Sequence, residues 1–191
     1  MIPELGHFTL ILALSVALVQ AVIPGMGLLL RRTDWMAVAK PACLLQFVLV
    51  LTAYGILTYS FIVHDFSVLY VANTSNSELP LIYRISGVWG AHEGSLLLWL
   101  LILSGWTAIL GIFSKHYPVD MAAGVISVLG FISIGFLLFS LFTSNPFLRS
   151  FPAPFDGADL NPLLQDPVMA IHPPMLYMGY VGFAIPFAFA I

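Results

Sequence analysis

A histidine next to two prolines is the residue of this chain with the clearest chemical potential. In "AIHPPMLYMGY", residues 170–180, His172 directly precedes Pro173 and Pro174, and an apolar run follows. Proline is well tolerated at the first position of a helix because its missing N–H has no intrahelical partner there. The sequence therefore predicts that the two prolines begin a helix and that His172 lies at its N-terminal cap.

Such a position would constrain the His172 imidazole. A following proline favours extended backbone geometry, which fixes the direction of the side chain, and the positive end of a helix disfavours imidazolium. Neutral imidazole is the form that binds metals. Two interpretations stay open: a histidine that only caps the helix, or an axial ligand of haem iron, for which the porphyrin already supplies four ligands.

A second polar group occurs in "YRISGVWGAHEGSLLLW", residues 83–99. Its three glycines permit tight turns or close backbone approach, and Trp89 has the amphipathic ring that settles at a membrane interface. His92 and Glu93 stand just before an apolar run. They are either a helix start, with Glu93 near the positive end of the dipole, or a polar pair that contacts a ligand or orients a neighbouring group.

Other chemistry finds little support. There is no CxxC or Cys/His spacing typical of zinc, and Cys43 lies in an apolar run where it is expected to be a small buried hydrophobe. Asp156 and Asp159 do not fit the spacing of an EF-hand loop. The remaining histidines are interpreted as boundary or loop residues. Without a basic patch, nucleic acid is a poor partner.

The elements that must position these residues are membrane spans. Hydrophobic residues form 60% of the 191 residues and charged residues 8%, against about 25% charged in soluble domains. A span needs about 20 apolar residues. Five runs are therefore predicted to be helices of an all-α integral membrane protein: Phe8–Leu30, Ala42–Val63, Ser95–Phe113, Met121–Thr143 and Met175–Ile191. The fifth run is short, from which we expect a fragment or one piece of a split protein.

The cations predict the orientation. Arg31, Arg32 and Lys40 lie between the first two spans and Lys115 between the third and fourth, whereas the two longer connections carry one cation each. The positive-inside rule puts the short basic connections in the cytoplasm. The N-terminus and two long loops, 64–94 and 144–174, are then expected on the outer, periplasmic side.

Two other classes of function use membrane spans of this kind. A transporter or channel fragment would need ionisable residues inside its spans, and the predicted span interiors contain none. A structural assembly subunit that docks partners through its outer loops stays open, and it would show no haem absorbance in complex with those partners.

The motifs "WGAHEGSLLLW" (89–99) and "NPLLQDPVMAIHPPMLYMGYVG" (161–182), together with the opening "MIPELGHFTLILALSVALVQ", closely resemble the CcmF family. The resemblance spans essentially the whole chain, and the NrfE-type paralogues share the pattern. It implies a multi-pass protein of the bacterial inner membrane, surrounded by lipid. Such a protein is the haem lyase component that receives haem from the chaperone CcmE and, with CcmH and CcmI, supports its attachment to apocytochrome c.

The resemblance also implies site residues. His172 matches a histidine that is an axial ligand of a b-type haem held transiently at the outer face, with Trp89 and His92 as supporting groups. The family's tryptophan-rich haem loop and second outer histidine have no counterpart in these 191 residues. The second ligand is therefore expected outside this chain, in a separately encoded C-terminal CcmF part. Alone, the chain is expected to be inactive, whether as a split subunit or as a gene fragment.

Overall fold

The apolar runs form five long helices in a computed structural model, which describes residues 1–191. Their bounds follow from turn residues: Pro3 stands in the first turn of the first helix, and Pro118 precedes the fourth long helix. The elements are α1 (Ile2–Leu29), α2 (Thr33–Met36), α3 (Ala39–Ile62), α4 (Leu69–Thr74), α5 (Leu81–Gly87), α6 (His92–Phe113), a 3₁₀ turn (Ser114–His116), α7 (Val119–Phe142), a 3₁₀ turn (Pro162–Gln165), α8 (Pro167–Gly182) and α9 (Ala184–Ala190).

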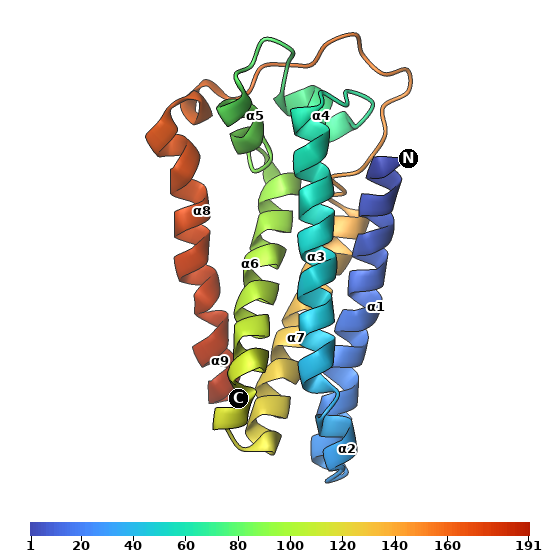
Figure 1. Cartoon of the computed structure of the whole chain (residues 1–191), viewed down its shortest axis with the longest axis vertical. Coiled ribbons are helices and arrows are strands. Elements are labelled where there is room, and N and C mark those ends of the chain that lie inside the picture. Colours follow the sequence, from blue (N-terminus) through green and yellow to red (C-terminus); the bar gives the residue numbers. More distant parts are fainter.

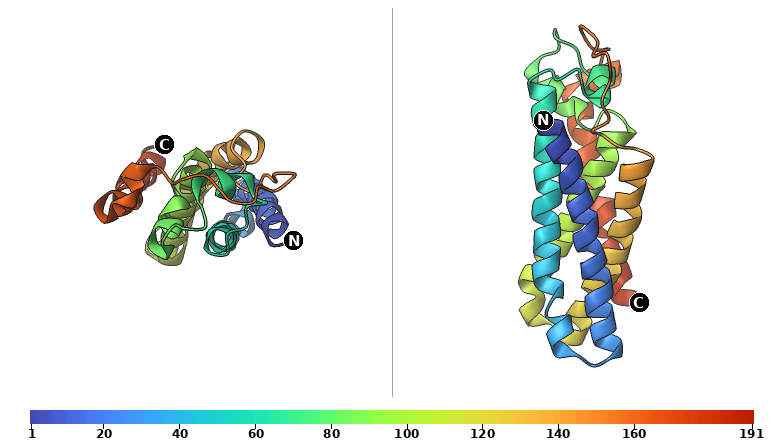
Figure 2. Two further views of the ribbon diagram at one scale, coloured as in Figure 1. Left: turned by 90° about the horizontal axis from the view of Figure 1, so that it is seen from above. Right: turned by 90° about the vertical axis from the view of Figure 1, so that its right-hand side faces the viewer.

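The long helices run up and down through one bundle (Figure 1). The N-terminus and both long connections, 63–91 and 143–166, lie at one end, which we call the loop end. The short connections lie at the opposite end together with the C-terminus (Figures 1 and 2). α1, α3, α6 and α7 pack on one another, whereas α8 lies at the periphery against α6. The prediction of an all-α protein with five spans is confirmed.

Small residues allow the central helices to approach closely. A Cβ on Gly130 of α7 would stand 2.9 Å from the backbone nitrogen of Ala21 in α1, so only glycine fits there without a shift. Cys43 of α3 is buried against Gly111 of α6, as expected of a small apolar residue. Helices in lipid associate through such close contacts between small residues, because burial of apolar surface contributes little free energy there.

The two long connections fold together over the loop end. The Leu69 N–H donates to the Leu148 carbonyl at 2.8 Å, and the Ala158 N–H donates to the Ala72 carbonyl at 2.7 Å. Leu160 of the second connection is buried, and its side chain lies against Gly90 of the first. The two connections are therefore packed against each other, although Phe151 and Phe155 are fully exposed.

Candidate functional site

α8 begins earlier than the sequence suggested. Asp166 is its N-cap, and one carboxylate oxygen accepts the N–H groups of Val168 at 2.9 Å and Met169 at 3.0 Å. Pro167 then occupies the first helical position, where proline is favoured. The prediction that Pro173 and Pro174 start this helix is therefore wrong, and so is the placement of His172 at its cap.

His172 lies in the second turn of α8, with helical backbone on both sides. Pro173 therefore does not hold it extended, and His172 is not the cap at which the helix dipole would keep an imidazole neutral. Because the candidate span is Pro167–Ala190, His172 also stands within a span. The helices extend beyond the predicted spans, so the first two turns of α8 contain His172 and those of α1 contain Glu4 and His7, outside the interiors that were predicted to lack ionisable residues.

The His172 side chain is exposed, and it makes no hydrogen bond or ion pair with the rest of the chain. Its helical neighbours at three and four residues' distance are Val168, Met169, Met175 and Leu176. They are all apolar, and all of them are exposed. We call these five residues the His172 face. The His172 face is an unpaired imidazole among exposed apolar side chains, in the part of α8 that begins at the loop end of the bundle (Figure 1).

The Trp89 side chain contacts the backbone of the same helix, α8. Its indole N–H donates to the Ala170 carbonyl at 2.9 Å, two residues before His172. Trp89 lies in the turn between α5 and α6, and its ring packs against the main core, the larger cluster of buried apolar side chains contributed mainly by α1, α3, α6 and α7. Of the predicted supporting residues, Trp89 is therefore the one whose hydrogen bond reaches the segment that carries His172.

The turn that carries Trp89 is fixed by Tyr70 of α4. The Tyr70 hydroxyl accepts the Ala91 N–H at 3.1 Å and donates to the Val88 carbonyl at 3.1 Å. Burial raises the pKa of Tyr70 well above its usual range, so the phenol stays protonated and able to donate. A Cβ at Gly94 would stand 1.7 Å from the Val88 carbonyl oxygen. Gly94 is thus required by close approach.

His92 is less well placed. It is the first residue of α6, its side chain is 70% exposed, and its Nδ1 lies 3.4 Å from a carboxylate oxygen of Glu93. No hydrogen bond or ion pair joins His92 to α8. The arrangement fits a helix start with Glu93 in the first turn, and the role of His92 at a ligand stays a prediction.

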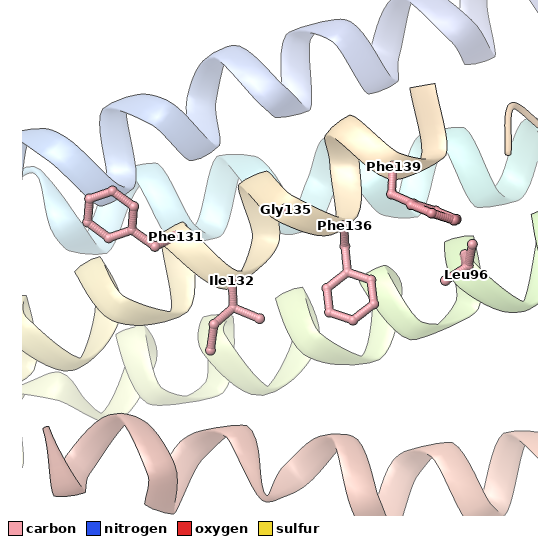
Figure 3. Close-up of a pocket in the computed structure, with 6 residues that line it drawn as sticks. All are labelled: Leu96, Phe131, Ile132, Gly135, Phe136 and Phe139. Carbon is pink, nitrogen blue, oxygen red and sulfur yellow. The ribbon is translucent and has the colours of Figure 1, made fainter. Parts of the chain in front are cut away.

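Further along α8, aromatic residues attach the helix to the bundle. Trp99 of α6 packs against Tyr180 and Phe136, with ring centroids 5.1 and 4.8 Å apart, respectively. The indole N–H of Trp106 donates to the Met178 carbonyl at 3.2 Å. Between Leu96 of α6 and α7 lies an apolar groove of about 430 Å³, which no polar side chain lines (Figure 3).

Sequence reasoning missed three groups: the Asp166 cap, the Tyr70 hydroxyl and the Ala170 carbonyl. The Asp-Pro pair at 166–167 was a usable signal, because Asp favours the cap and Pro the next position. Nothing in the sequence could pair Trp89 with Ala170, since that contact depends on how α6 and α8 pack.

The donor set limits which metal this surface could hold. No three His, Cys, Asp or Glu side chains converge on one point, so a bare ion would lack protein ligands. A haem needs only an axial ligand and an apolar surface for its ring, since the porphyrin supplies four ligands. The His172 face offers both, as one side of such a site.

Known proteins resemble this chain along its whole length. The family model described as "Cytochrome C assembly protein" matches residues 89–191. "Cytochrome c-type biogenesis protein CcmF" of Pseudomonas aeruginosa is 59% identical over 100% of this chain and 29% of its own length. The Escherichia coli protein of that name is 52% identical, over 100% and 30%. "Cytochrome c-type biogenesis protein NrfE" of Haemophilus influenzae is 45% identical, over 100% and 30%.

A solved structure, "Cytochrome c Heme Lyase CcmF", superposes with a TM-score of 0.83 at 27% identity. The similarity covers 98% of this chain and 29% of that protein. The chain thus spans about 29% of the length of the structure and relatives that it matches.

Proposed function

The chain belongs to the CcmF family of cytochrome c assembly proteins, and from this premise we propose that it handles haem during cytochrome c maturation. In this proposal it forms part of a haem lyase of the bacterial inner membrane. Family membership supports a role in cytochrome c biogenesis and implies haem in general. The position of the haem, its ligand and its route belong to the proposal.

The observation that carries the proposal is His172, exposed on an apolar helical face at the loop end with no polar partner. A histidine in such a place gains nothing from packing, yet one of its ring nitrogens is free to bind iron. A bound b-type haem would supply the iron and the group to be attached to apocytochrome c. The neighbouring apolar side chains would shield one side of the ring from water.

A single histidine fills one axial position. The second ligand would come from a segment outside these 191 residues, such as a separately encoded CcmF part. We propose CcmE as the donor of haem, and CcmH and CcmI as the proteins that present apocytochrome c at the loop end.

The loop end would face the periplasm. In support of this, Arg31, Arg32, Lys40 and Lys115 all lie at the opposite end of the bundle, among the short connections, where the positive-inside rule expects the cytoplasm. Cys43 is the only cysteine and is buried. A thiol reagent would therefore label only a cysteine introduced at Ser150, and this labelling shows on which side of the membrane the loop end lies. Labelling of S150C by an impermeant maleimide only after the cells are opened would contradict this orientation.

The proposal is tested with a chimaera in which this chain replaces the matching residues of the Pseudomonas aeruginosa relative, in cells that lack their own CcmF. We expect the chimaera to support the maturation of c-type cytochromes. H172A should reduce their haem-stained yield by at least about tenfold, because even the loss of a residue that only orients a metal ligand has an effect of about this size. H116A is the matched control, because His116 is an exposed histidine at the opposite end. An undiminished yield and haem content in H172A would remove this residue from the mechanism. A normal yield without any haem absorbance would favour an assembly subunit.

A further inference from the structure

The two prolines of α8 leave two backbone carbonyls without their helical donors. In a helix the N–H of residue i donates to the carbonyl of residue i−4, and proline has no N–H. Pro173 therefore frees the carbonyl of Met169, and Pro174 frees that of Ala170. Met169 is 42% exposed, whereas Ala170 is only 4% exposed. The buried carbonyl at Ala170 is the one that needs another donor.

The indole of Trp89 supplies that donor. Its N–H reaches the Ala170 carbonyl at 2.9 Å from the turn before α6. The donor is itself held in place, because the Trp89 carbonyl accepts the Ser95 hydroxyl at 2.9 Å and the ring packs on the main core. A hydrogen bond between segments 81 residues apart thus replaces one that the helix cannot make.

We propose that Trp89 is a positioning residue for His172. It holds the turn of α8 before the proline pair against the bundle, and that turn carries the imidazole. The inference rests on the proposed function, since it concerns the ligand of that site. It makes the family-based expectation of a supporting group specific: Trp89 acts through the backbone of α8.

Trp106 provides a matched comparison within the same helix. Its indole N–H also donates to an α8 carbonyl, that of Met178 at 3.2 Å. Residue 182, four positions later, is a glycine that retains its N–H, so this carbonyl has a helical donor available. Loss of the Trp106 bond should therefore be tolerated, whereas loss of the Trp89 bond should not.

The test is a double-mutant cycle in the 191-residue chain, with hydrogen exchange measured for the amides of 168–172. W89F keeps an aromatic ring but removes the donor. We expect it to speed exchange by roughly tenfold, as when a buried acceptor loses its partner. W106F should have little effect.

In P174A the backbone N–H restored at position 174 can donate to the Ala170 carbonyl, so the amides of W89F/P174A should exchange nearly as slowly as those of P174A. Exchange unchanged in W89F, or an equal effect of W89F in both backgrounds, would overturn the proposal.

Two further measurements keep the test decisive. If W89F does not fold, P174A alone suffices: its restored backbone N–H competes for the Ala170 carbonyl, so the Trp89 indole proton should exchange faster than in the wild type, and an unchanged rate counts against the proposal. Titration with reduced haem under carbon monoxide reports on His172 itself. Carbon monoxide occupies one axial position of the iron, so the haem needs only one ligand from the protein. We expect roughly tenfold weaker binding in W89F and recovery in W89F/P174A. Equal binding by H172A would refute the proposed function, while the exchange cycle would still decide the role of Trp89.

Discussion

At the scale of single residues, the site depends on close contacts around one turn. Tyr70 bonds the backbone on both sides of Trp89, and Gly94 lets that turn lie directly against α6. The glycine is needed for space, since no glycine in the chain has a positive φ. The geometry of Trp89, and through it that of α8, is therefore set by residues that do not take part in the proposed haem contact.

We predict that G94A destabilises the protein. An added methyl group would stand 1.7 Å from the Val88 carbonyl oxygen, so the backbone must shift, at a cost of about 1–3 kcal/mol or more. Unfolding in increasing concentrations of a denaturing detergent measures this loss of stability. G135A is the control, because a Cβ at Gly135 meets no atom within 4 Å. Equal stability of G94A and G135A would show that the turn is not tightly packed.

At the scale of elements, the second long connection is attached to the first through Asp156. Its carboxylate accepts the Ser77 N–H at 2.9 Å, the Ser77 hydroxyl at 2.7 Å and the Gly157 N–H at 2.7 Å. The hydrogen bonds from Ser77 lower the pKa of Asp156 below its usual value. The connection that leads into α8 is thus held down by a charged group at the surface.

This attachment should weaken in acid. Because the pKa of Asp156 is lower in the folded protein than in the unfolded chain, its contribution is complete above the unfolded value of about 3.9 and is lost as pH falls through the folded pKa. Proteolysis within 150–158 should be faster in D156N than in the wild type at pH 7, and the two should converge at low pH. D120N, at the other end of the bundle, serves as control. A wild-type pH dependence that persists in D156N would assign the effect to another group.

The elements also show what the sequence could and could not predict. Long apolar runs fix the five spans, because lipid leaves the backbone no partner but its own helix. The sequence does not predict the start of α8, because a proline pair inside a helix is unfavourable in isolation. It is tolerated here because Trp89, distant in sequence, replaces one lost hydrogen bond. The sequence singles out His172 by its place before two prolines, and its role stays a prediction, whereas its surroundings follow from tertiary packing.

At the scale of the whole molecule, α8 differs from the other long helices. It lies at the edge of the bundle, and the apolar stretch that α8 forms with α9 is only 11% buried, against 33–50% for the other spans. The His172 face is thus open to a large ligand or to a further polypeptide. A tightly packed core of four helices holds one exposed helix whose loop end carries the proposed haem ligand (Figures 1 and 2).

The central claim is that His172 binds haem iron, and exchange of the ligand tests it most directly. Haem would be purified with the chimaera described above and with its H172M and H172C variants, and its absorption and electron paramagnetic resonance spectra compared; H116M is the control. Because axial ligands determine these spectra, the account predicts that both His172 variants lose the haem or show a changed spectrum, while H116M matches the wild type. Full haem content with the wild-type spectrum in H172M and H172C would contradict it.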